Sequence, residues 1–469
     1  MREKEKKKKN VNINPFVLIF AVIAVCGILT FIITPGELNN GVYTALPQNQ
    51  VNFNNIFNIF RAIPYGIKDS VSIVVLTLIV GGALEVYKRT GAIDNGISTL
   101  VQAFSDQMSH FLLIALIVVF SAIGGFLGWV ETLIPFIPLV VAVVLALGYD
   151  AMTAAAVCIV GTMGGFVAGP TNIYTVGVAN GVLQSMGVLP KNESVFTGIG
   201  FRIVVWVLMT AISVVYISIY AAKTKKHPEK SLVRDVDVSD IKFDVSKIKN
   251  PKLTGVQGIV LLMILGAMIM TVYGMQKGFN GVKWGLDEVS AVFLASGIIA
   301  GILGKLKVHE IANAFIEGSK GAVAGAMIVG VARGVYWVLE AGHVNATIVY
   351  YTTELLRGTK PYTAALGIMI LVTFINGLIP SGSGKAALLS PIIVPIAIQL
   401  GLTPQSAVLS YQFGDGITNM FWFSMGTLLI YLNYARAPLN KWYRFFVPLM
   451  VIFYIFAVIV LWVAIAVHY

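Results

Sequence analysis

The sequence predicts an all-α, polytopic membrane protein made of two inverted repeats, each with a re-entrant helical hairpin and a broken transmembrane helix. The first observation behind this prediction is composition. The 469-residue chain is 57% hydrophobic and 12% charged, with a mean hydropathy of +0.83, whereas soluble domains are about 25% charged. The second is that two long apolar regions are interrupted by polar, glycine-rich breaks, and the third is that these regions superpose when the chain is compared with itself.

Seven uninterrupted apolar stretches are long enough to cross about 30 Å of hydrocarbon. The first is longer than the core of a signal peptide, so we expect it to remain as a span that follows a basic, cytoplasmic N-terminus over residues 1–14. The tract 308–320 is amphipathic and predicts a separate helix at the membrane surface. The seven stretches cover residues 15–34, 69–87, 199–221, 254–274, 286–304, 321–339 and 443–467.

The two interrupted regions share one layout. In the first, polar breaks predict a hairpin over about 111–147 and a broken helix over about 150–185. In the second, equivalent breaks predict a hairpin over about 363–400 and a broken helix over about 404–432. A hairpin that re-enters the membrane returns to its own side, so only the broken helix of each region should cross.

One constant shift along the chain aligns the two regions, which indicates internal duplication. We call it the repeat offset; it superposes Pro138 on Pro391, Gly148 on Gly401, and Gly161 on Gly414. The first repeat then covers 15–222, a cytoplasmic linker covers 223–253, an extra transmembrane helix covers 254–274, and the second repeat covers 275–469. The odd number of crossings before the second repeat inverts it.

Basic residues support a cytoplasmic N-terminus in a multi-pass protein of the inner (plasma) membrane. The connections that this topology places inside carry clustered lysine and arginine. The segments placed outside are poorer in them, although 340–362 retains two. The basic connections hold Lys88 and Arg89, the loop 223–253, then Lys305, Lys307 and Lys320, and finally Arg436, Lys441 and Arg444.

The breaks supply the candidate binding groups. Irregular backbone at membrane depth leaves polar groups that protein, water or a ligand must satisfy, and half-helix ends can hold substrates and ions. Glu131 and Asp415 are ionisable groups at the breaks, which makes them functional candidates, although Asp415 could instead cap a half helix and Glu131 could be an interfacial anchor. The polar residues beside them are Thr171, Asn172, Ser381, Gly382, Ser383, Gly384, Thr418 and Asn419.

Three charged side chains have more than one interpretation. Lys385, at the second hairpin tip, suits a carboxylate, or it could extend to the membrane surface. Glu85 and Arg333 lie at almost equivalent places in the two repeats, which favours a buried structural ion pair over direct substrate contact.

The five histidines lie at span ends or in loops, and Cys26 and Cys158 lie in apolar runs, so no metal site, cofactor or disulfide framework is predicted.

Other classes of protein fit the sequence less well. The net charge of +11 comes from polar connections without interleaved aromatic residues, which argues against nucleic-acid binding. A phosphate-binding loop that would mark an ATP-driven motor is missing. Asp150 and Asp415 do not stand in the motifs of an intramembrane aspartyl protease, so we expect no enzyme. A channel stays open from sequence alone, although duplicated broken helices suit alternating access better.

The segment PSGSGKAALLSPIIVPIAIQLGLTPQSAVLSYQFGDGITNM and the block GGALEVYKRTGAID resemble the YfcC-like family across essentially the whole chain. That family belongs to the broad ion transporter superfamily, which also holds anaerobic four-carbon dicarboxylate carriers and sodium-coupled dicarboxylate symporters. The resemblance implies an inverted-repeat carrier, often a homodimer, that moves its transport domain like an elevator. It also implies that Gly128, Thr132 and Pro170 join the residues above in lining the substrate and ion sites.

The resemblance and the charges together predict secondary active transport of a small charged metabolite across the lipid bilayer. Members of the family are commonly described as basic amino-acid antiporters, which favours exchange of arginine for ornithine. The alternative is a sodium- or proton-coupled symporter of a dicarboxylate or another amino acid. Lys385 departs from the glutamine expected in many relatives and fits either substrate. Sodium and the proton both stay open as coupling ions.

Overall fold

The computed structural model describes residues 15–39, 42–103, 106–241, 253–279, 282 and 284–469. Ten helices among the described residues are long and apolar enough to cross a membrane. The protein is a mostly helical, multi-pass membrane protein, as the sequence predicts. It departs from all-α by one short antiparallel hairpin of β1 (Gly36–Asn39) and β2 (Val42–Ala45).

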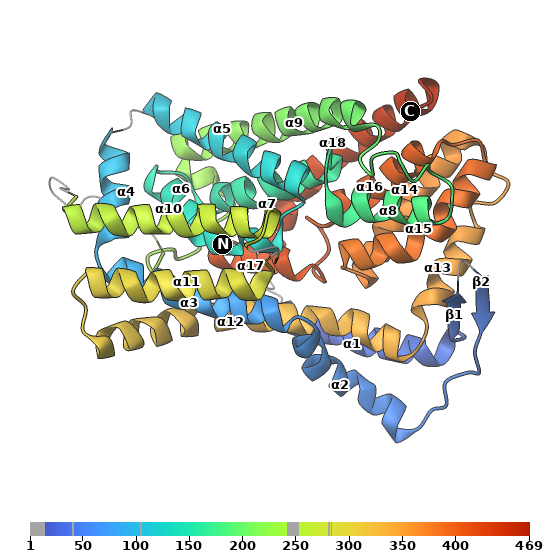
Figure 1. Cartoon of the computed structure of the whole chain (residues 1–469), viewed down its shortest axis with the longest axis horizontal. Coiled ribbons are helices and arrows are strands. Elements are labelled where there is room, and N and C mark those ends of the chain that lie inside the picture. Colours follow the sequence, from blue (N-terminus) through green and yellow to red (C-terminus); the bar gives the residue numbers. More distant parts are fainter. Residues whose placement is uncertain (1–14, 40–41, 104–105, 242–252, 280–281, 283) are drawn as a thin grey trace, which may run out of the picture.

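One layer of the fold consists of long helices that pack through glycines (Figure 1). Gly66 packs against the backbone of Gly330 and Gly334, and Gly81 packs against that of Gly318, so a side chain at any of these positions would separate the helices. The helices of this layer are α1 (Pro15–Ile32), α2 (Phe53–Asp69), α3 (Val71–Arg89), α11 (Leu286–Leu303) and α12 (Val308–Ala341).

Helix α12 corrects one sequence prediction. We expected a separate surface helix over 308–320 and a span over 321–339, but α12 is continuous over 34 residues. The prediction rested on the change from an amphipathic pattern over 308–320 to an apolar one over 321–339. Gly318 allows the close approach of α3, so the helix continues through its glycines and uses one of them for packing.

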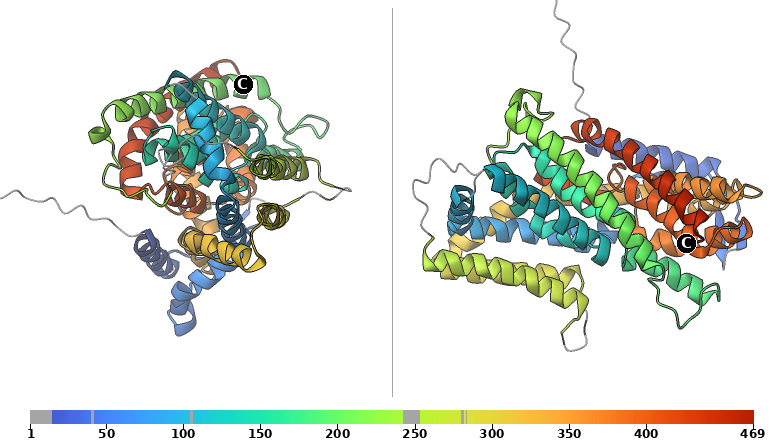
Figure 2. Two further views of the ribbon diagram at one scale, coloured as in Figure 1. Left: turned by 90° about the vertical axis from the view of Figure 1, so that its left-hand side faces the viewer. Right: turned by 90° about the horizontal axis from the view of Figure 1, so that it is seen from above.

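A larger layer covers α12 and α3 on one side (Figures 1 and 2). Its first group contains α5 (Asp106–Ala122), α6 (Ile137–Ala146), α7 (Ala151–Ala168), α8 (Val178–Ser185) and α9 (Ile199–Lys226). Its second group contains α14 (Pro361–Leu378), α15 (Gly382–Gln399), α16 (Pro404–Thr418), α17 (Gly426–Tyr434) and α18 (Leu439–Ala466). The remaining helices are α4 (Ala92–Ala103), α10 (Gly255–Gln276) and α13 (Asn345–Glu354).

The two groups have matching helix ends at the repeat offset. Helices α6 and α15 end at Ala146 and Gln399, which correspond to each other at this offset. The next helix of each group starts after an N-cap side chain, Asp150 or Thr403, that accepts a hydrogen bond from the amide three residues on. Gly148 and Gly401 precede these caps with φ of 85° and 87°. The end of one helix and the N-cap of the next therefore occupy corresponding positions in the two groups.

Part of the predicted linker is docked on the larger layer. Ser231 donates a hydrogen bond to Asp150 Oδ2 at 2.6 Å, and Asp235 and Asp240 form ion pairs with Lys441 and Arg436. Residues 228–241 therefore pack against the protein instead of forming a simple solvated connection. The rest of the linker, 242–252, and the basic N-terminus, 1–14, lie outside the described residues.

Candidate functional site

A cavity of about 450 Å³ lies between the two layers, at the turns that interrupt the larger layer. Its wall from the first layer carries Asp69 and Arg333, and its opposite wall carries Glu131. These are the charged side chains among the described residues that line it. The polar and aromatic groups around them come from Ser70, Trp129, Thr132, Phe166, Tyr174, Trp284, Ser381, Ser383, Asn419, Ser424 and Thr427.

The first turn of the site is a short non-helical tip between α5 and α6. The helix widens into a π-helical turn, Ile123–Leu127, and ends at Gly128, which has φ of 68°. This left-handed conformation favours glycine. The tip is fixed from α17, because Tyr431 donates a hydrogen bond to Val130 O at 2.7 Å. Glu131 begins the 3₁₀ helix Glu131–Phe136 and accepts a hydrogen bond from Thr427 Oγ1 at 3.3 Å.

The break after α7 lies directly behind this tip. Thr171 donates a hydrogen bond to Phe126 O at 2.6 Å, which joins the break to the tip. The fully buried Asn172 caps the π-helical turn Ile173–Gly177, accepting from Tyr174 N at 3.0 Å. A Cβ atom at Gly128 would overlap the Asn172 side chain. The tip and the break therefore form one tightly packed unit.

The second turn, between α14 and α15, presents polar groups to the cavity. Ser381 is the N-cap of α15 and accepts a hydrogen bond from Gly384 N at 3.2 Å. The free amides at the start of this helix carry a partial positive charge. Gly382 is held from α16, because Tyr411 donates a hydrogen bond to its carbonyl oxygen at 3.2 Å. A polar ligand in the cavity could reach these groups.

Behind the second turn, Lys385 and Asp415 form a fully buried ion pair. Lys385 Nζ lies 2.6 Å from Asp415 Oδ1, and neither side chain is exposed. The ammonium also donates hydrogen bonds to Asn376 Oδ1 and, at 3.1 Å, to Ile379 O. A buried charge is costly unless a partner compensates it. Lys385 therefore balances Asp415 and does not extend to the membrane surface.

Asn376 joins this pair to the break after α16. Its Nδ2 lies within hydrogen-bond distance of Asp415 O (3.0 Å), Thr418 Oγ1 (2.9 Å) and Asn419 Oδ1 (2.8 Å). The amide thereby links α14 to three groups near the end of α16. The second break is held by hydrogen bonds on its inner side, and Asn419 also reaches the cavity wall.

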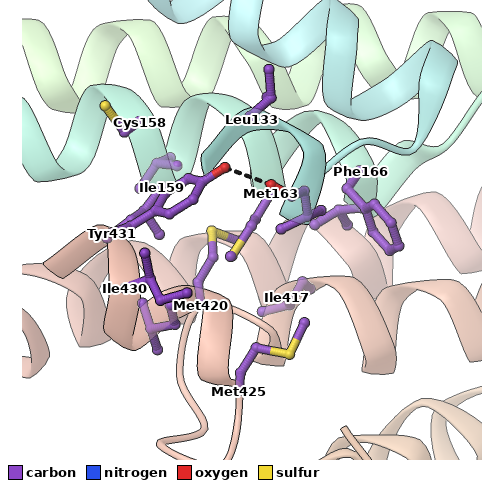
Figure 3. Close-up of a cluster of buried hydrophobic side chains, with 14 of the residues drawn as sticks. Leu133, Cys158, Ile159, Met163, Phe166, Ile417, Met420, Met425, Ile430 and Tyr431 are labelled. Atoms are coloured by element: carbon purple, nitrogen blue, oxygen red, sulfur yellow. Dashed lines mark hydrogen bonds between the residues drawn. The ribbon is translucent and has the colours of Figure 1, made fainter. Parts of the chain in front are cut away.

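The two breaks meet through a buried apolar cluster (Figure 3). Met163 of α7 lies beside Met420, which follows α16, and Phe166, Ile417 and Met425 belong to the same cluster. A cross-connection accompanies this packing, because Gln412 Nε2 donates a hydrogen bond to Phe166 O at 2.7 Å. The cluster excludes water from the region between the breaks, so that polar groups there depend on protein partners.

The predicted site residues fall into two sets. Those that line the cavity are Gly128, Glu131, Thr132, Ser381, Gly382, Ser383 and Asn419. Those that lie behind it or beside it are Pro170, Thr171, Asn172, Gly384, Lys385, Asp415 and Thr418. The second set holds the turns in place through the contacts described above.

The predicted ion pair between Glu85 and Arg333 is wrong. Glu85 pairs with Arg89 at 3.3 Å, and its Cβ lies beside Gly318 of α12. Arg333 is fifteen residues further along that helix, a distance of about 22 Å. Its guanidinium lies over the ring of Tyr336, 4.7 Å from the centroid, and lines the cavity. Corresponding positions at the repeat offset need not be neighbours in space, and these two are not.

Several residues of the cavity wall were missed as site candidates. Asp69 ends α2, whereas the sequence placed it at the first position of the predicted span 69–87, where a carboxylate at a span end does not indicate a binding site. Tyr174 follows the first break by two residues, and Thr427 follows the second by several. A single tyrosine or threonine in an apolar run does not by itself indicate a binding site. Arg333 was considered for substrate contact, but a structural ion pair with Glu85 was preferred, although an ionisable residue within an apolar span is a functional candidate.

Clusters with metal-ligand chemistry are missing from the part of the chain that the structure describes. No group of three or more histidine, cysteine, aspartate or glutamate side chains there is placed to hold a metal ion. Cys26 and Cys158 are both buried and free. The chemistry of the cavity rests on its carboxylates, its guanidinium and the polar turns.

These features define a multi-pass membrane transporter. Residues 14–466 match the model of the DcuC family, described as C4-dicarboxylate anaerobic carrier. The chain belongs to this family, whose members are secondary transporters and not enzymes.

Two curated relatives cover most of the chain. One, from Escherichia coli (strain K12), is named "Putative basic amino acid antiporter YfcC" and is 29% identical over 402 residues, which are 83% of this chain and 77% of the relative. The other, an uncharacterized protein from Haemophilus influenzae (strain ATCC 51907 / DSM 11121 / KW20 / Rd), is 27% identical over 416 residues, 87% of this chain and 78% of the relative.

Two solved transporter structures are similar over nearly the whole chain. The YdaH transporter of Alcanivorax borkumensis has 14% identity and a TM-score of 0.42, and the match covers 97% of this chain and 99% of that one. MtrF of Neisseria gonorrhoeae, from a class described as antimetabolite efflux pumps, has 16% identity and a TM-score of 0.43, with coverage of 96% and 95%. At these scores neither likeness carries an argument.

Proposed function

We propose that this transporter is a basic amino-acid antiporter that exchanges arginine for ornithine. The observation that carries the proposal is the charge of the cavity wall. Asp69 and Glu131 bring two formal negative charges and Arg333 brings one positive charge. The wall is therefore one charge negative, which complements a basic amino acid with one carboxylate and two cationic groups.

The geometry supports one orientation of such a substrate. The guanidinium of Arg333 can bind the α-carboxylate through two parallel hydrogen bonds. Glu131, on the opposite wall, can accept hydrogen bonds from the cationic end of the substrate. Carboxylates and a guanidinium on facing walls would select a molecule that carries both signs of charge.

The position of Lys385 removes it as a direct ligand for either substrate, including the dianionic one that a free lysine would have favoured. A free lysine at the second turn would have added positive charge next to the ligand. Lys385 is instead fully buried and neutralised by Asp415. A dicarboxylate in the cavity would face two carboxylates and have Arg333 as its one cationic partner on the described wall.

A coupled symporter of a dicarboxylate is the second candidate. It is favoured by the family description, which names C4-dicarboxylates, whereas the name of the relative from Escherichia coli favours basic amino acids. Purified protein in proteoliposomes separates the two. Uptake of labelled arginine driven by internal ornithine, without a sodium gradient, is the expected result. Sodium-dependent uptake of succinate with no arginine counterflow would overturn the proposal.

Substitution of the charged wall residues tests the binding model. Glu131→Gln and Arg333→Gln should each raise the KM for arginine about 30-fold or more, since loss of one partner of a buried charge pair costs ~2–5 kcal/mol. The matched controls are Glu193→Gln and Arg357→Gln, two charge changes on exposed residues outside the cavity. Equal KM values in all four variants would exclude the model.

The architecture that we propose for transport has two inverted repeats, each with a re-entrant hairpin and a broken helix, and a cytoplasmic N-terminus. The helix ends that match at the repeat offset support the repeats. The larger layer, which carries both turns, would move against α3 and α12 as in an elevator, within a homodimer. Accessibility of single cysteines introduced at Lys88 and Gln48, labelled from either side of the membrane, tests the orientation.

A further inference from the structure

The Lys385 ammonium is surrounded by three oxygen atoms from two helices, α14 and α16. Asp415 Oδ1 of α16 lies 2.6 Å away. Asn376 Oδ1 of α14 accepts a hydrogen bond from it, as does Ile379 O at 3.1 Å. Ile379 is the C-cap of α14, where the helix dipole favours a cation. The lysine itself extends from the first turn of α15, so its aliphatic chain delivers the charge to this set of oxygens.

This set of oxygens has the composition of a site for a small monovalent cation. A carboxylate, an amide oxygen and a main-chain carbonyl at a helix end converge on one point that is sealed from solvent. Asp415 Oδ2 has no hydrogen-bond partner among the described residues. The carboxylate thus relies on the ammonium for its compensation.

The first group of helices provides an internal comparison. At the repeat offset, Lys385 corresponds to Thr132 and Asp415 corresponds to Thr162. Both threonines are buried and neutral. The second group of helices therefore has both the cation and its carboxylate, and the first group has neither. This pattern indicates that the two charges depend on each other.

We propose that the second turn is a monovalent-cation site that is permanently occupied by the Lys385 ammonium. Resting on the proposed carrier function, this assigns the turn a role in coupling. A free cation that binds and leaves on each side of the membrane couples transport to its gradient. A tethered ammonium cannot leave, so the second turn requires no inorganic ion and provides no coupling to one.

Chemical rescue tests the site without any transported substrate. Lys385→Ala removes three methylene groups and the ammonium, and n-propylammonium can replace them. In detergent, the variant should lose on the order of 5 °C in its unfolding midpoint. It should regain most of that loss, saturably, with n-propylammonium chloride and not with tetramethylammonium chloride, which has the charge without an N–H donor. The same response to both salts would overturn the proposal.

Two further proteins complete the test. The wild type should respond equally to both salts, because its site is filled. The variant Lys385→Met with Asp415→Asn replaces the charge pair by neutral side chains of similar size, and it should fold with no specific response to n-propylammonium. If Lys385→Ala cannot be purified, folding of this double variant supports a requirement for charge balance, and its failure to fold contradicts it. Neither readout depends on which metabolite is carried.

Discussion

The two turns of the larger layer hold corresponding positions in the two groups of helices, but they differ in structure and in where they place a carboxylate. The first turn uses Gly128 in a left-handed conformation and places a carboxylate, Glu131, at the cavity wall. The second uses the N-terminus of α15 and holds its carboxylate, Asp415, behind the wall in a pair with Lys385. The comparison teaches that the number of charges near a site is a poor guide to the charge that a substrate meets.

The difference also separates binding from scaffolding. Charge at the first turn lies where a ligand can reach it, whereas charge at the second turn is fully buried and internally balanced. Substitution of the charged residue at the first turn, Glu131, should therefore change substrate affinity, and substitution of the charged residues at the second, Lys385 and Asp415, should first change stability. Two residues that correspond at the repeat offset can be substituted in the same way, so that each variant serves as a control for the other.

The largest effect is expected at Asp415. Asp415→Ala leaves the Lys385 ammonium buried without a counter-charge, which should lower the free energy of unfolding by ~3–5 kcal/mol. The corresponding change in the first group, Thr162→Ala, should cost ~1 kcal/mol, because it removes one buried methyl group and a neutral hydroxyl that has no hydrogen-bond partner among the described residues. Unfolding in a graded detergent mixture measures both. Equal losses in the two variants would contradict the difference between the turns.

An intermediate effect is expected at the glycines. Gly128→Ala should lower the free energy of unfolding by ~2 kcal/mol, because alanine disfavours a φ of 68° and its Cβ would overlap Asn172. Gly382→Ala should be neutral or slightly stabilising, since its Cβ would lie 3.4 Å from Thr175 Cγ2 in an ordinary contact and alanine favours the helix. Thermal unfolding midpoints compare the two, and a greater loss at Gly382 would reverse the ranking.

The smallest effect is expected at Thr427. Its hydroxyl donates a hydrogen bond of 3.3 Å to Glu131 Oε1 and so helps to orient that carboxylate. Thr427→Val should raise the KM for arginine about threefold, as expected for loss of one weak hydrogen bond. Counterflow in proteoliposomes provides the measurement. An unchanged KM would show that Glu131 is oriented by the backbone of the first turn alone.

Much of the fold was predictable because hydrophobic length and polar breaks are local signals. The helices α6, α7, α15 and α16 end within a few residues of the expected positions, since glycine, proline and capping residues mark those ends. The continuous α12 was not predicted. Its sequence changes from an amphipathic to an apolar pattern near residue 320, and only the structure shows that the helix runs through this change, with Gly318 packed against α3.

The sequence identified individual residues of the site, but it did not show which of them contact one another. Glu131 and Ser381 were recognised as candidates because polar residues at breaks are conspicuous in an apolar chain. The pairing of Lys385 with Asp415 was not, because Asp415 lies thirty residues further along the chain on another helix.

Arg333 was assigned to Glu85, although its guanidinium lies over Tyr336 of its own helix. Asp69 carried no signal, since a carboxylate at a helix end is ordinary in sequence. Long-range packing decides which charges face the cavity.

Helix α7 is buried along its entire length, with all eighteen residues inside the protein. Lipid therefore never touches it, and no face of it is free to vary. A scan of every substitution along α7 should give a profile of tolerance with no helical period. In α10, where about a fifth of the span is buried, apolar replacements should be accepted on most of the circumference. The innermost helix is thus the segment in which evolutionary drift is most restricted.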